Sequence, residues 1–589
     1  MKILDKELWQ ALDDDDQDLV KSLIKQTTKF SQVGRLLSNI YNSFPTSLHK
    51  KMATYFKVAK EVNLIMKWKK ILFQSVFYLL LIILLITWSP AVAYSQAGFG
   101  DNRVMLQGFY WESYRHGHPQ QFPNYGSTPW YEIVEREAPE IREGRFDLIW
   151  LPPPSYAGDV DENYQITDHS NMAGYAPKEY FNLNNAYGTH QQQRQMLEAL
   201  LNNGIEPVAD IIINHRNGSQ GWANFKNPDW GTWSITRDDE AFTDPRSEVY
   251  NTPIEQRGNP EETTEYDHLG TTTYAYGSYR DIDHTNSTVR RDIIRYLLQL
   301  KSLGYRGWRY DMVHGYHAKR LATYNRASNP TFSVGEYDWG RQPQSRGWVW
   351  HSATQPGNLK TGSSVFDFST KSTLQGNKTN YRAWYSPANK GIGLVGDTTD
   401  GHSWKNKAVT FLENHDTGYR TNEFGEPEKD NNNNNKVDSF ANNWEVEQGY
   451  AYILTHPGVP TVFWKHYFDW GPDLHNKITA LINARKVAGV NANSTIHTQN
   501  NARDQGVYGA FITGTNGDLY VRIGGSDQNW QPYYSGYQDY REYAKGNGWK
   551  VWVKLPGNPP VKQARYSQSL PIPQEQTPDN IQVPDSWLD

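Results

Sequence analysis

The sequence predicts a protein of the α/β class whose centre is a (β/α)8 barrel, or TIM barrel, over residues 96–485. Three segments share one layout, in which an amphipathic helical pattern is followed by a glycine and then by a short apolar run. Strands that alternate with helices in this way form a parallel sheet covered on both faces. Two departures from the repeat predict an irregular domain inserted after the third strand and an antiparallel β-domain near the C-terminal end.

The three repeats are WYEIVEREAPEIREGRFDLIWLPPP, QMLEALLNNGIEPVADIIINH and VRRDIIRYLLQLKSLGYRGWRYD. Gly144, Gly204 and Gly304 stand just past the helical patterns, where a glycine with positive φ commonly ends a helix. A doubly wound open sheet is the alternative, but no glycine-rich phosphate loop follows the first strand. Eight strands in all suit a barrel, because further apolar runs of strand length begin at Val104, Phe332, Ser363, Ala408 and Val459.

The other parts of the chain lack the repeat. Residues 216–285 are too many for a structureless loop, so we interpret them as a small inserted domain, domain B, on the functional face of the barrel. Short alternating runs over 490–557, with Thr515-Asn516-Gly517 as a hairpin turn, predict the antiparallel β-domain. The tail, 558–589, is rich in proline and glutamine, and we expect it to be disordered.

The N-terminal part of the sequence has the features of an export signal. Residues 66–95 begin with lysines, continue with an apolar run from Ile71 to Trp88, and contain small residues suited to cleavage near Ala93. We therefore expect a secreted protein, and we interpret residues 1–65 as an upstream extension of the reading frame. The alternative is a cytoplasmic segment followed by a membrane anchor, so a membrane is a partner only if the segment is not cleaved.

Composition excludes several function classes. The 589 residues are enough for two or three domains. A net charge of −5 provides no basic surface for nucleic acid. The chain has no cysteine, which excludes thiolate metal sites, cysteine nucleophiles and disulfides. Aromatic residues make up 14% of the chain, a content that suits the packing of cores and the stacking of sugar rings equally well.

Polar side chains stand where the predicted strands end. In a parallel barrel these ends meet on one face, which is where catalysis takes place. A single aspartate after a strand is more often a helix cap, but several carboxylates on one rim repel each other and are costly unless function requires them. The residues concerned are Asp210, Asn214 and His215 after the third strand, Arg309 and Asp311 on the fourth, Glu336 on the fifth, and Asn414, His415 and Asp416 after the seventh.

Two carboxyl groups at such a rim can hydrolyse a glycosidic bond. One donates a proton to the leaving oxygen, and the other acts at the anomeric carbon. Arg309 lies two residues before Asp311 and points the same way along a strand, so it could hold Asp311 ionised. Glu336 has no arginine at that spacing, which makes it the better candidate for the acid.

Four segments, ADIIINH, GWRYDMVHG, VGEYDW and LENHD, resemble in sequence and order the four signatures of the α-amylase family, glycoside hydrolase family 13. The resemblance extends over roughly Gln96 to Gly557 and is strongest to maltotetraose-forming and plant-like α-amylases. It implies a monomeric enzyme that hydrolyses internal α-1,4-glucosidic bonds of starch or glycogen with retention. The alternatives are an exo-acting maltotetraose-forming amylase, a transglycosylase, and a non-catalytic glucan-binding or membrane-anchored protein.

The resemblance also implies roles for single residues. Asp311 would be the nucleophile, Glu336 the acid/base and Asp416 the third carboxylate, which holds sugar hydroxyls. The second signature ends in His314 and Gly315, a departure from the commonest Lys-His ending, and His314 is expected on the leaving-group side. The remaining substrate-binding residues implied are Arg309, which orients Asp311, His215 and His415, which bond to the sugar, Tyr175, which stacks on it, and Asp210, which supports the cluster.

Calcium is the cofactor that the resemblance implies. Calcium takes six to eight oxygen ligands, and Asn214, Gly315 through its carbonyl, and Asp283 would supply three of them. Such a site would fasten the inserted domain to the barrel. Separately, several tryptophans near strand ends are candidates for stacking on glucan, although core packing is the better interpretation of Trp308; these residues are Trp111, Trp308, Trp339 and Trp470.

Overall fold

A computed structural model describes most of the chain. The leading segment 1–65, the predicted signal 66–95 and Trp339 lie outside the described residues. Within the described part, no helix is both long enough and apolar enough to cross a membrane. The described residues are 100–167, 173–262, 279–337, 341–421, 426–429, 440, 442–525, 539–554 and 568–588.

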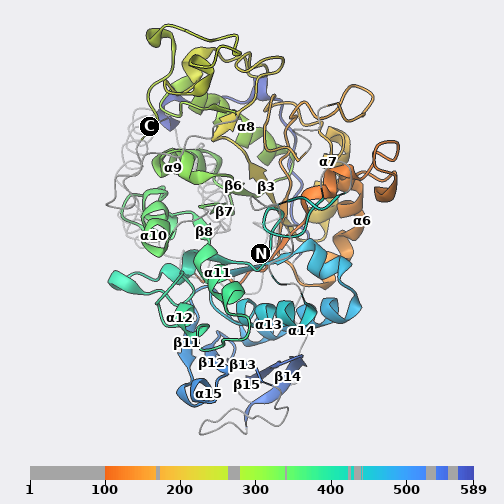
Figure 1. Ribbon diagram of the computed structural model, residues 1–589, viewed down its shortest axis with the longest axis vertical. Coiled ribbons are helices and arrows are strands. Elements are labelled where there is room, and N and C mark those ends of the chain that lie inside the picture. The colour runs from red at the N-terminus through yellow and green to blue at the C-terminus, as the bar shows by residue number, and fades with distance from the viewer. Residues whose placement is uncertain are drawn as a thin grey trace, which may run out of the picture. The chain divides into compact units, whose positions relative to one another are not determined.

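Eight parallel strands close into a barrel, in the order β1-β10-β9-β8-β7-β6-β3-β2 (Figure 1). The predicted fold is therefore confirmed, and each apolar run named above contains one strand. The strands are β1 (Met105–Gln107), β2 (Leu148–Leu151), β3 (Glu206–Ile211), β6 (Gly307–Tyr310), β7 (Phe332–Gly335), β8 (Ser364–Phe366), β9 (Ala408–Thr410) and β10 (Val459–Phe463).

Alternation along β6 separates the core from the site. Trp308 and Tyr310 are fully buried and point outward to a helix, where the Trp308 indole N–H donates to Ser328 Oγ and the Tyr310 hydroxyl donates to Asn325 Oδ1. Arg309, between them, faces the barrel interior because neighbouring side chains on a strand take opposite faces. Core packing is thus the correct interpretation of Trp308.

Helices alternate with the barrel strands along the chain. Two of the three glycines predicted to end a helix with positive φ do so. Gly204 and Gly304 have φ of 70° and 140°, but Gly144 has φ of −66° and Arg145 takes the positive value instead. Gly144 is therefore not needed for a positive φ, and that part of the prediction is wrong. A Cβ at Gly144 would lie 2.3 Å from the Tyr467 hydroxyl, so close packing requires the glycine. The helices are α6 (Trp130–Glu143), α7 (His190–Asn202), α8 (Ser287–Leu303), α9 (Ala318–Ser328), α10 (Gln342–His351), α11 (Phe368–Gly376), α12 (Tyr385–Ala388), α13 (Asn443–Ile453), α14 (Pro472–Ala488) and α15 (Asn500–Asp504).

The segment inserted after β3 is irregular. Its ends pair as two short antiparallel strands, β4 (His215–Arg216) and β5 (Arg280–Asp281). Between them the described residues form only single turns of 3-10 helix, at Thr232–Ser234, Glu240–Phe242 and Ile254–Gln256. The β4–β5 pair returns the chain to the barrel rim, so the insertion stands beside the ends of β3 and β6.

A five-stranded antiparallel sheet follows the barrel, in the order β11-β12-β13-β15-β14. The predicted hairpin joins β12 to β13, and α13 and α14 pack against this sheet. The sequence patterns missed the two outer strands, which are mostly polar and partly exposed. The strands are β11 (Thr495–Thr498), β12 (Tyr508–Thr513), β13 (Asp518–Ile523), β14 (Arg541–Gly546) and β15 (Trp549–Lys554).

Residues 568–588, here called the C-terminal strap, are ordered against the barrel helices, so the expectation of a disordered tail is wrong for them. The strap ends beside α9 (Figure 1). Ile581 and Leu588 are buried in it, and the Leu570 N–H donates to the Leu201 carbonyl at 2.8 Å. Composition did not reveal this order because the strap's partners lie far away in the sequence, in α7, in α8 and just after α8.

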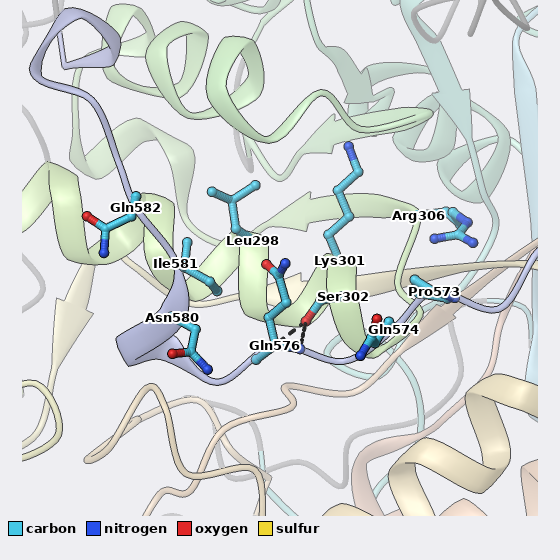
Figure 2. A pocket seen from close by; sticks show the side chains of 10 residues that line it. All are labelled: Leu298, Lys301, Ser302, Arg306, Pro573, Gln574, Gln576, Asn580, Ile581 and Gln582. Carbon is cyan, nitrogen blue, oxygen red and sulfur yellow. Dashed lines mark hydrogen bonds between the residues drawn. The ribbon is translucent and has the colours of Figure 1, made fainter. Parts of the chain in front are cut away.

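Arginines hold the strap. Arg290 Nε donates to the Leu588 carbonyl at 2.9 Å, and Arg295 Nη2 donates to the Pro578 carbonyl at 2.8 Å. Arg306 bonds to the Pro571 carbonyl, while Arg194 and Arg291 pair with Glu575 and Asp585 at 2.9 and 2.7 Å. A cavity of about 430 Å³ lies between the strap and α8. Figure 2 shows the residues that line it, with the Gln576 side chain pointing toward Leu298.

Candidate active site

One buried guanidinium lies at the centre of the rim. Arg309 Nη1 is 2.6 Å from Asp210 Oδ1 and 2.8 Å from Asp311 Oδ1, and Nη2 is 2.8 Å from Glu336 Oε2. The Arg309 and Asp210 side chains are fully buried, while Asp311 and Glu336 are 10% and 13% exposed. Three carboxylates thus surround a single positive charge, and two of them reach the surface of the site.

The structure corrects the argument from sequence spacing that distinguished Asp311, as the ionised nucleophile, from Glu336, as the acid. Strand spacing indicated an arginine beside Asp311 alone, but Arg309 contacts both carboxylates. The reason is the flat, forked guanidinium, whose nitrogens reach β6 on one side and the end of β7 on the other. Arg309 therefore organises the pair and cannot by itself decide which member keeps a proton.

Burial and charge favour one retained proton on this pair. Burial raises the pKa of Asp311 well above its ordinary value, Arg309 opposes the rise, and the carboxylates of Glu336 and Asp210 add to it. The same carboxylates raise the pKa of Arg309 despite its burial, so the guanidinium remains charged. Two acidic groups that share one positive neighbour ionise in sequence, because like charges disfavour double ionisation.

Asp416 is the most exposed carboxylate of the site, with a side chain 41% exposed. His415 Nε2 lies 3.0 Å from its Oδ2, and Gln107 Nε2 donates to His415 Nδ1 at 2.9 Å. Burial alone would raise the pKa of Asp416, but His415, Arg420 and Arg309 hold it below its ordinary value. Asp416 is therefore an ionised group with hydrogen-bonding capacity on the open side of the rim.

Asp210 has no access to a ligand and supports the others. Besides Arg309, its carboxylate accepts from the Tyr175 hydroxyl at 2.8 Å and from Trp150 Nε1 at 3.1 Å. The Tyr175 ring is parallel to that of His415 within 5°, with centroids 5.1 Å apart. His215 Nε2 is 2.8 Å from the Tyr175 carbonyl, and burial lowers the pKa of His215 to about 4, so it is neutral near pH 7.

Some residues of the site carry no signal in the sequence patterns. Gln107 and Trp150 lie on β1 and β2 and appear as ordinary strand residues. Met312, just after Asp311, has φ of 42° although it is not glycine. Such a strained backbone is kept only where the surroundings fix it, and here the Val313 N–H donates to the Glu336 carbonyl at 3.1 Å.

Two family models match the chain. "Alpha amylase, catalytic domain" matches residues 141–355, and "Alpha-amylase C-terminal beta-sheet domain" matches residues 487–553. The first covers β2 to α10 and includes Asp210, Arg309, Asp311 and Glu336, and the second covers the antiparallel sheet. The chain belongs to the α-amylase family.

Curated relatives agree with this assignment to a family of glycoside hydrolases. "Alpha-amylase 3, chloroplastic" of Arabidopsis thaliana is 30% identical over 79% of this chain and 45% of its own length. "Probable alpha-amylase 2" of the same plant is 29% identical over 77% of this chain and 94% of its own length. "Glucan 1,4-alpha-maltotetraohydrolase" of Roseateles saccharophilus is 29% identical over 67% of this chain and 64% of its own length. The chain thus spans about half of the first relative and nearly all of the second.

A solved structure shares the fold. The Anoxybacillus α-amylase is 12% identical, and its alignment covers 78% of this chain and 99% of that chain with a TM-score of 0.52. At this identity the likeness concerns the fold alone. It agrees with the closed barrel and with the separate antiparallel sheet of this α-amylase family member.

The predicted calcium ligands of this family member lie near one another. A Cβ on Gly315 would lie 1.8 Å from Asn214 Oδ1, so only glycine allows this approach. Gly315 and Asp283 line one cavity of about 10 Å³, which is room for roughly one water or ion. Both Asp283 oxygens accept two hydrogen bonds each, Oδ1 from the Thr285 N–H and hydroxyl and Oδ2 from the Asn259 N–H and side-chain amide. Asn214 does not line this cavity, although its Oδ1 approaches Gly315. Amide, carbonyl and carboxylate oxygens are the types of ligand that a hard cation takes.

The described residues contain no group of three or more acidic or histidine side chains suited to a metal. A calcium site in this family member would therefore depend on amide and backbone oxygens. The His314 ring is edge-on to the Tyr337 ring, with the ring centroids 6.0 Å apart. Among the predicted stacking residues, Trp111 is parallel to both Tyr175 and His415 within 6°, while Trp470 packs against His466 at 4.7 Å.

Proposed function

We propose that this protein is a retaining α-amylase that hydrolyses internal α-1,4-glucosidic bonds of starch or glycogen. The observation that carries the proposal is the Arg309 guanidinium, whose adjacent nitrogens hold Asp311 and Glu336 at 2.8 Å each. Retaining glycosidases need two carboxyl groups about 5–5.5 Å apart, while inverting enzymes need room for a water between them. Two carboxylates tied to one guanidinium suit the closer arrangement.

In the first step, the Asp311 carboxylate attacks the anomeric carbon while Glu336 gives its proton to the glycosidic oxygen. The bond between the anomeric carbon and the glycosidic oxygen breaks. The leaving chain departs as an alcohol, and the sugar remains as an ester of Asp311. Arg309 contacts both carboxyl groups. Its positive charge therefore stabilises the ionised Asp311 before this step and the ionised Glu336 after it. The step needs Glu336 protonated and Asp311 ionised.

In the second step, the Glu336 carboxylate takes a proton from water, and the water oxygen attacks the anomeric carbon. Asp311 is released as a carboxylate, and the product has the anomeric configuration of the substrate. Asp416, ionised and 41% exposed, would accept hydrogen bonds from sugar hydroxyls. The Tyr175 ring would stack on the apolar face of the same sugar.

Calcium would be held by Asn214, Gly315 and Asp283 and would act as a structural clamp between the inserted domain and the barrel. We expect a chelator to lower the melting temperature by several degrees, and added calcium to restore it, since a ligand of the native state stabilises by mass action. Measurement by scanning calorimetry with and without chelator tests this. An unchanged melting temperature would remove calcium from the proposal.

Exo-acting release of one oligosaccharide is the second candidate, favoured by the likeness to a maltotetraohydrolase. Soluble starch should be incubated with the pure protein, and the products resolved over time. A broad ladder of early products supports internal cleavage, and a single early oligosaccharide supports exo action. Products longer than the substrate would indicate transglycosylation, and no products at all would contradict a catalytic function.

Export remains a proposal that rests on the sequence of residues 66–95. The basic start, apolar run and small residues near Ala93 are those of a cleaved signal. N-terminal sequencing of protein recovered outside the cells should give a first residue shortly after Ala93. Recovery of the intact segment in the membrane fraction would favour the anchor instead.

A further inference from the structure

Arg420 lies at the rim but outside the four signature segments, and it contacts three parts of the site. Its Nη1 is 3.4 Å from Asp416 Oδ1, and its guanidinium carbon is 4.2 Å from the centre of the Trp111 ring. On the other side, Nη2 donates to Glu428 Oε1 at 2.9 Å. The Arg420 side chain is only 12% exposed. A planar guanidinium between two carboxylates and on an aromatic face is confined to one orientation.

The backbone beside Arg420 is fixed by the 3-10 helix η1 (Trp111–Arg115). The Thr421 N–H donates to Glu112 Oε1 at 2.5 Å. Arg115 donates to the Thr421 hydroxyl at 2.6 Å and to its carbonyl at 2.9 Å. Glu112 and Arg115 are 2% and 1% exposed, so shifting Thr421 would break buried charge-assisted hydrogen bonds. The segment after β9 and the segment after β1 therefore position Arg420 together.

The two oxygens of Asp416 are held by different partners. His415 Nε2 lies 3.0 Å from Oδ2, and Arg420 Nη1 lies 3.4 Å from Oδ1. The Trp111 ring under Arg420 is parallel to the rings of Tyr175 and His415. A carboxylate that accepts hydrogen bonds from two neighbouring sugar hydroxyls must hold its plane in a fixed orientation. A partner on each oxygen prevents the carboxylate from rotating.

We propose that Arg420 is a positioning residue for glucan cleavage: it orients Asp416 toward the sugar hydroxyls and fixes Trp111 as a flat face at the same edge of the site. The inference rests on the proposed function, because Asp416 matters only if a sugar binds there. Arg420 acts through Asp416 and takes no part in bond making or breaking.

The test is a double-mutant cycle with Arg420→Met and Asp416→Asn, measured as kcat and KM on a chromogenic maltooligosaccharide. We expect Arg420→Met to lower kcat about tenfold with KM changed less than about twofold, since small misplacements of a binding group cost rate. In the Asp416→Asn background the same change should lower kcat less than about twofold, because coupled residues are not additive. Arg420→Lys should retain an intermediate kcat, since lysine keeps the charge but not the fork.

Arg346→Met is the matched control. Arg346 pairs with Asp397 at 2.6 Å and lies over the Trp404 ring, so it offers the same kinds of contact on α10. Its loss should lower the melting temperature, because it leaves the fully buried Asp397 carboxylate without this cation. The kcat should stay within about twofold, because Asp397 and Trp404 are not residues of the site. If Arg420→Met does not fold, Arg420→Lys replaces it in the same cycle, with a smaller loss that should again disappear in the Asp416→Asn background.

Two results would overturn the inference: an unchanged kcat in Arg420→Met, or an equal loss of kcat with and without the Asp416 carboxylate. Either would leave the proposed function intact, provided that the unmodified protein degrades starch. An unmodified protein without activity on starch would instead contradict the proposed function itself.

Discussion

The catalytic rim and the C-terminal strap both depend on arginine, but in different ways. At the rim, nitrogens of the fully buried Arg309 lie 2.6–2.8 Å from oxygens of three carboxylates. At the strap, the buried Arg290 and the partly exposed Arg194, Arg291 and Arg295 of α7 and α8 donate to carbonyl groups and to carboxylates. A buried charge cluster fails when one member is removed, whereas a surface arrangement loses its contacts one at a time.

The largest effect expected at the rim is on turnover. Glu336→Gln removes the proton donor and keeps the shape, so kcat should fall by roughly 10²–10⁴-fold, the range for loss of a general acid. Binding of starch to the variant should be close to that of the unmodified protein in a sedimentation assay. Near-normal turnover in this variant would exclude Glu336 as the acid/base.

A pair of arginine variants sharpens the comparison. Arg309→Met leaves Asp210 buried without a cation and should lower the free energy of unfolding by about 3–5 kcal/mol, the cost of breaking a buried pair. Arg295→Met, which loses a bond to the Pro578 carbonyl, should cost about 1 kcal/mol. Urea denaturation of both variants measures the difference, and equal losses would show that the two regions do not differ as described.

The sequence predicted the rim far better than the strap, and the reason is physical. Alternation along β6 placed Arg309 beside Asp311, because strand geometry is local and regular. The contact between Arg309 and Glu336 depends on the reach of one side chain across strands, and no spacing rule encodes it. The strap has no periodicity of its own, and its order comes from Arg290 and Arg295, nearly three hundred residues earlier in the chain.

Removal of the strap should have a smaller effect than the loss of Arg309. A chain that ends at Tyr566 loses the buried Ile581 and Leu588 and the arginine contacts. We expect the melting temperature to fall by about 2–5 °C, which corresponds to a loss of about 1–2 kcal/mol in the free energy of unfolding of a large domain. The kcat on starch at 25 °C should stay within about twofold. A tenfold loss of kcat would show that the strap also supports the site.

The smallest difference expected is in the response to pH. Because the pKa of Asp311 is raised above its ordinary value of 3.8, Asp311 takes up a proton at higher pH than a free aspartate does. Activity should therefore decline on the acid side at a pH above this value. At the strap, the bonds from Arg290 and Arg295 to carbonyl groups do not titrate in this range. A decline of activity only below pH 3.8 would contradict the role given to Asp311.

The mechanism depends on Asp311 and Glu336 acting from opposite faces of the sugar ring in two successive displacements. The most direct measurement is ¹H NMR of the anomeric protons during the first minutes of maltooligosaccharide hydrolysis, before mutarotation. The α-anomer should appear first, and the β-anomer only later by equilibration. Initial release of the β-anomer would mean a single displacement by water, which is incompatible with Asp311 as the nucleophile.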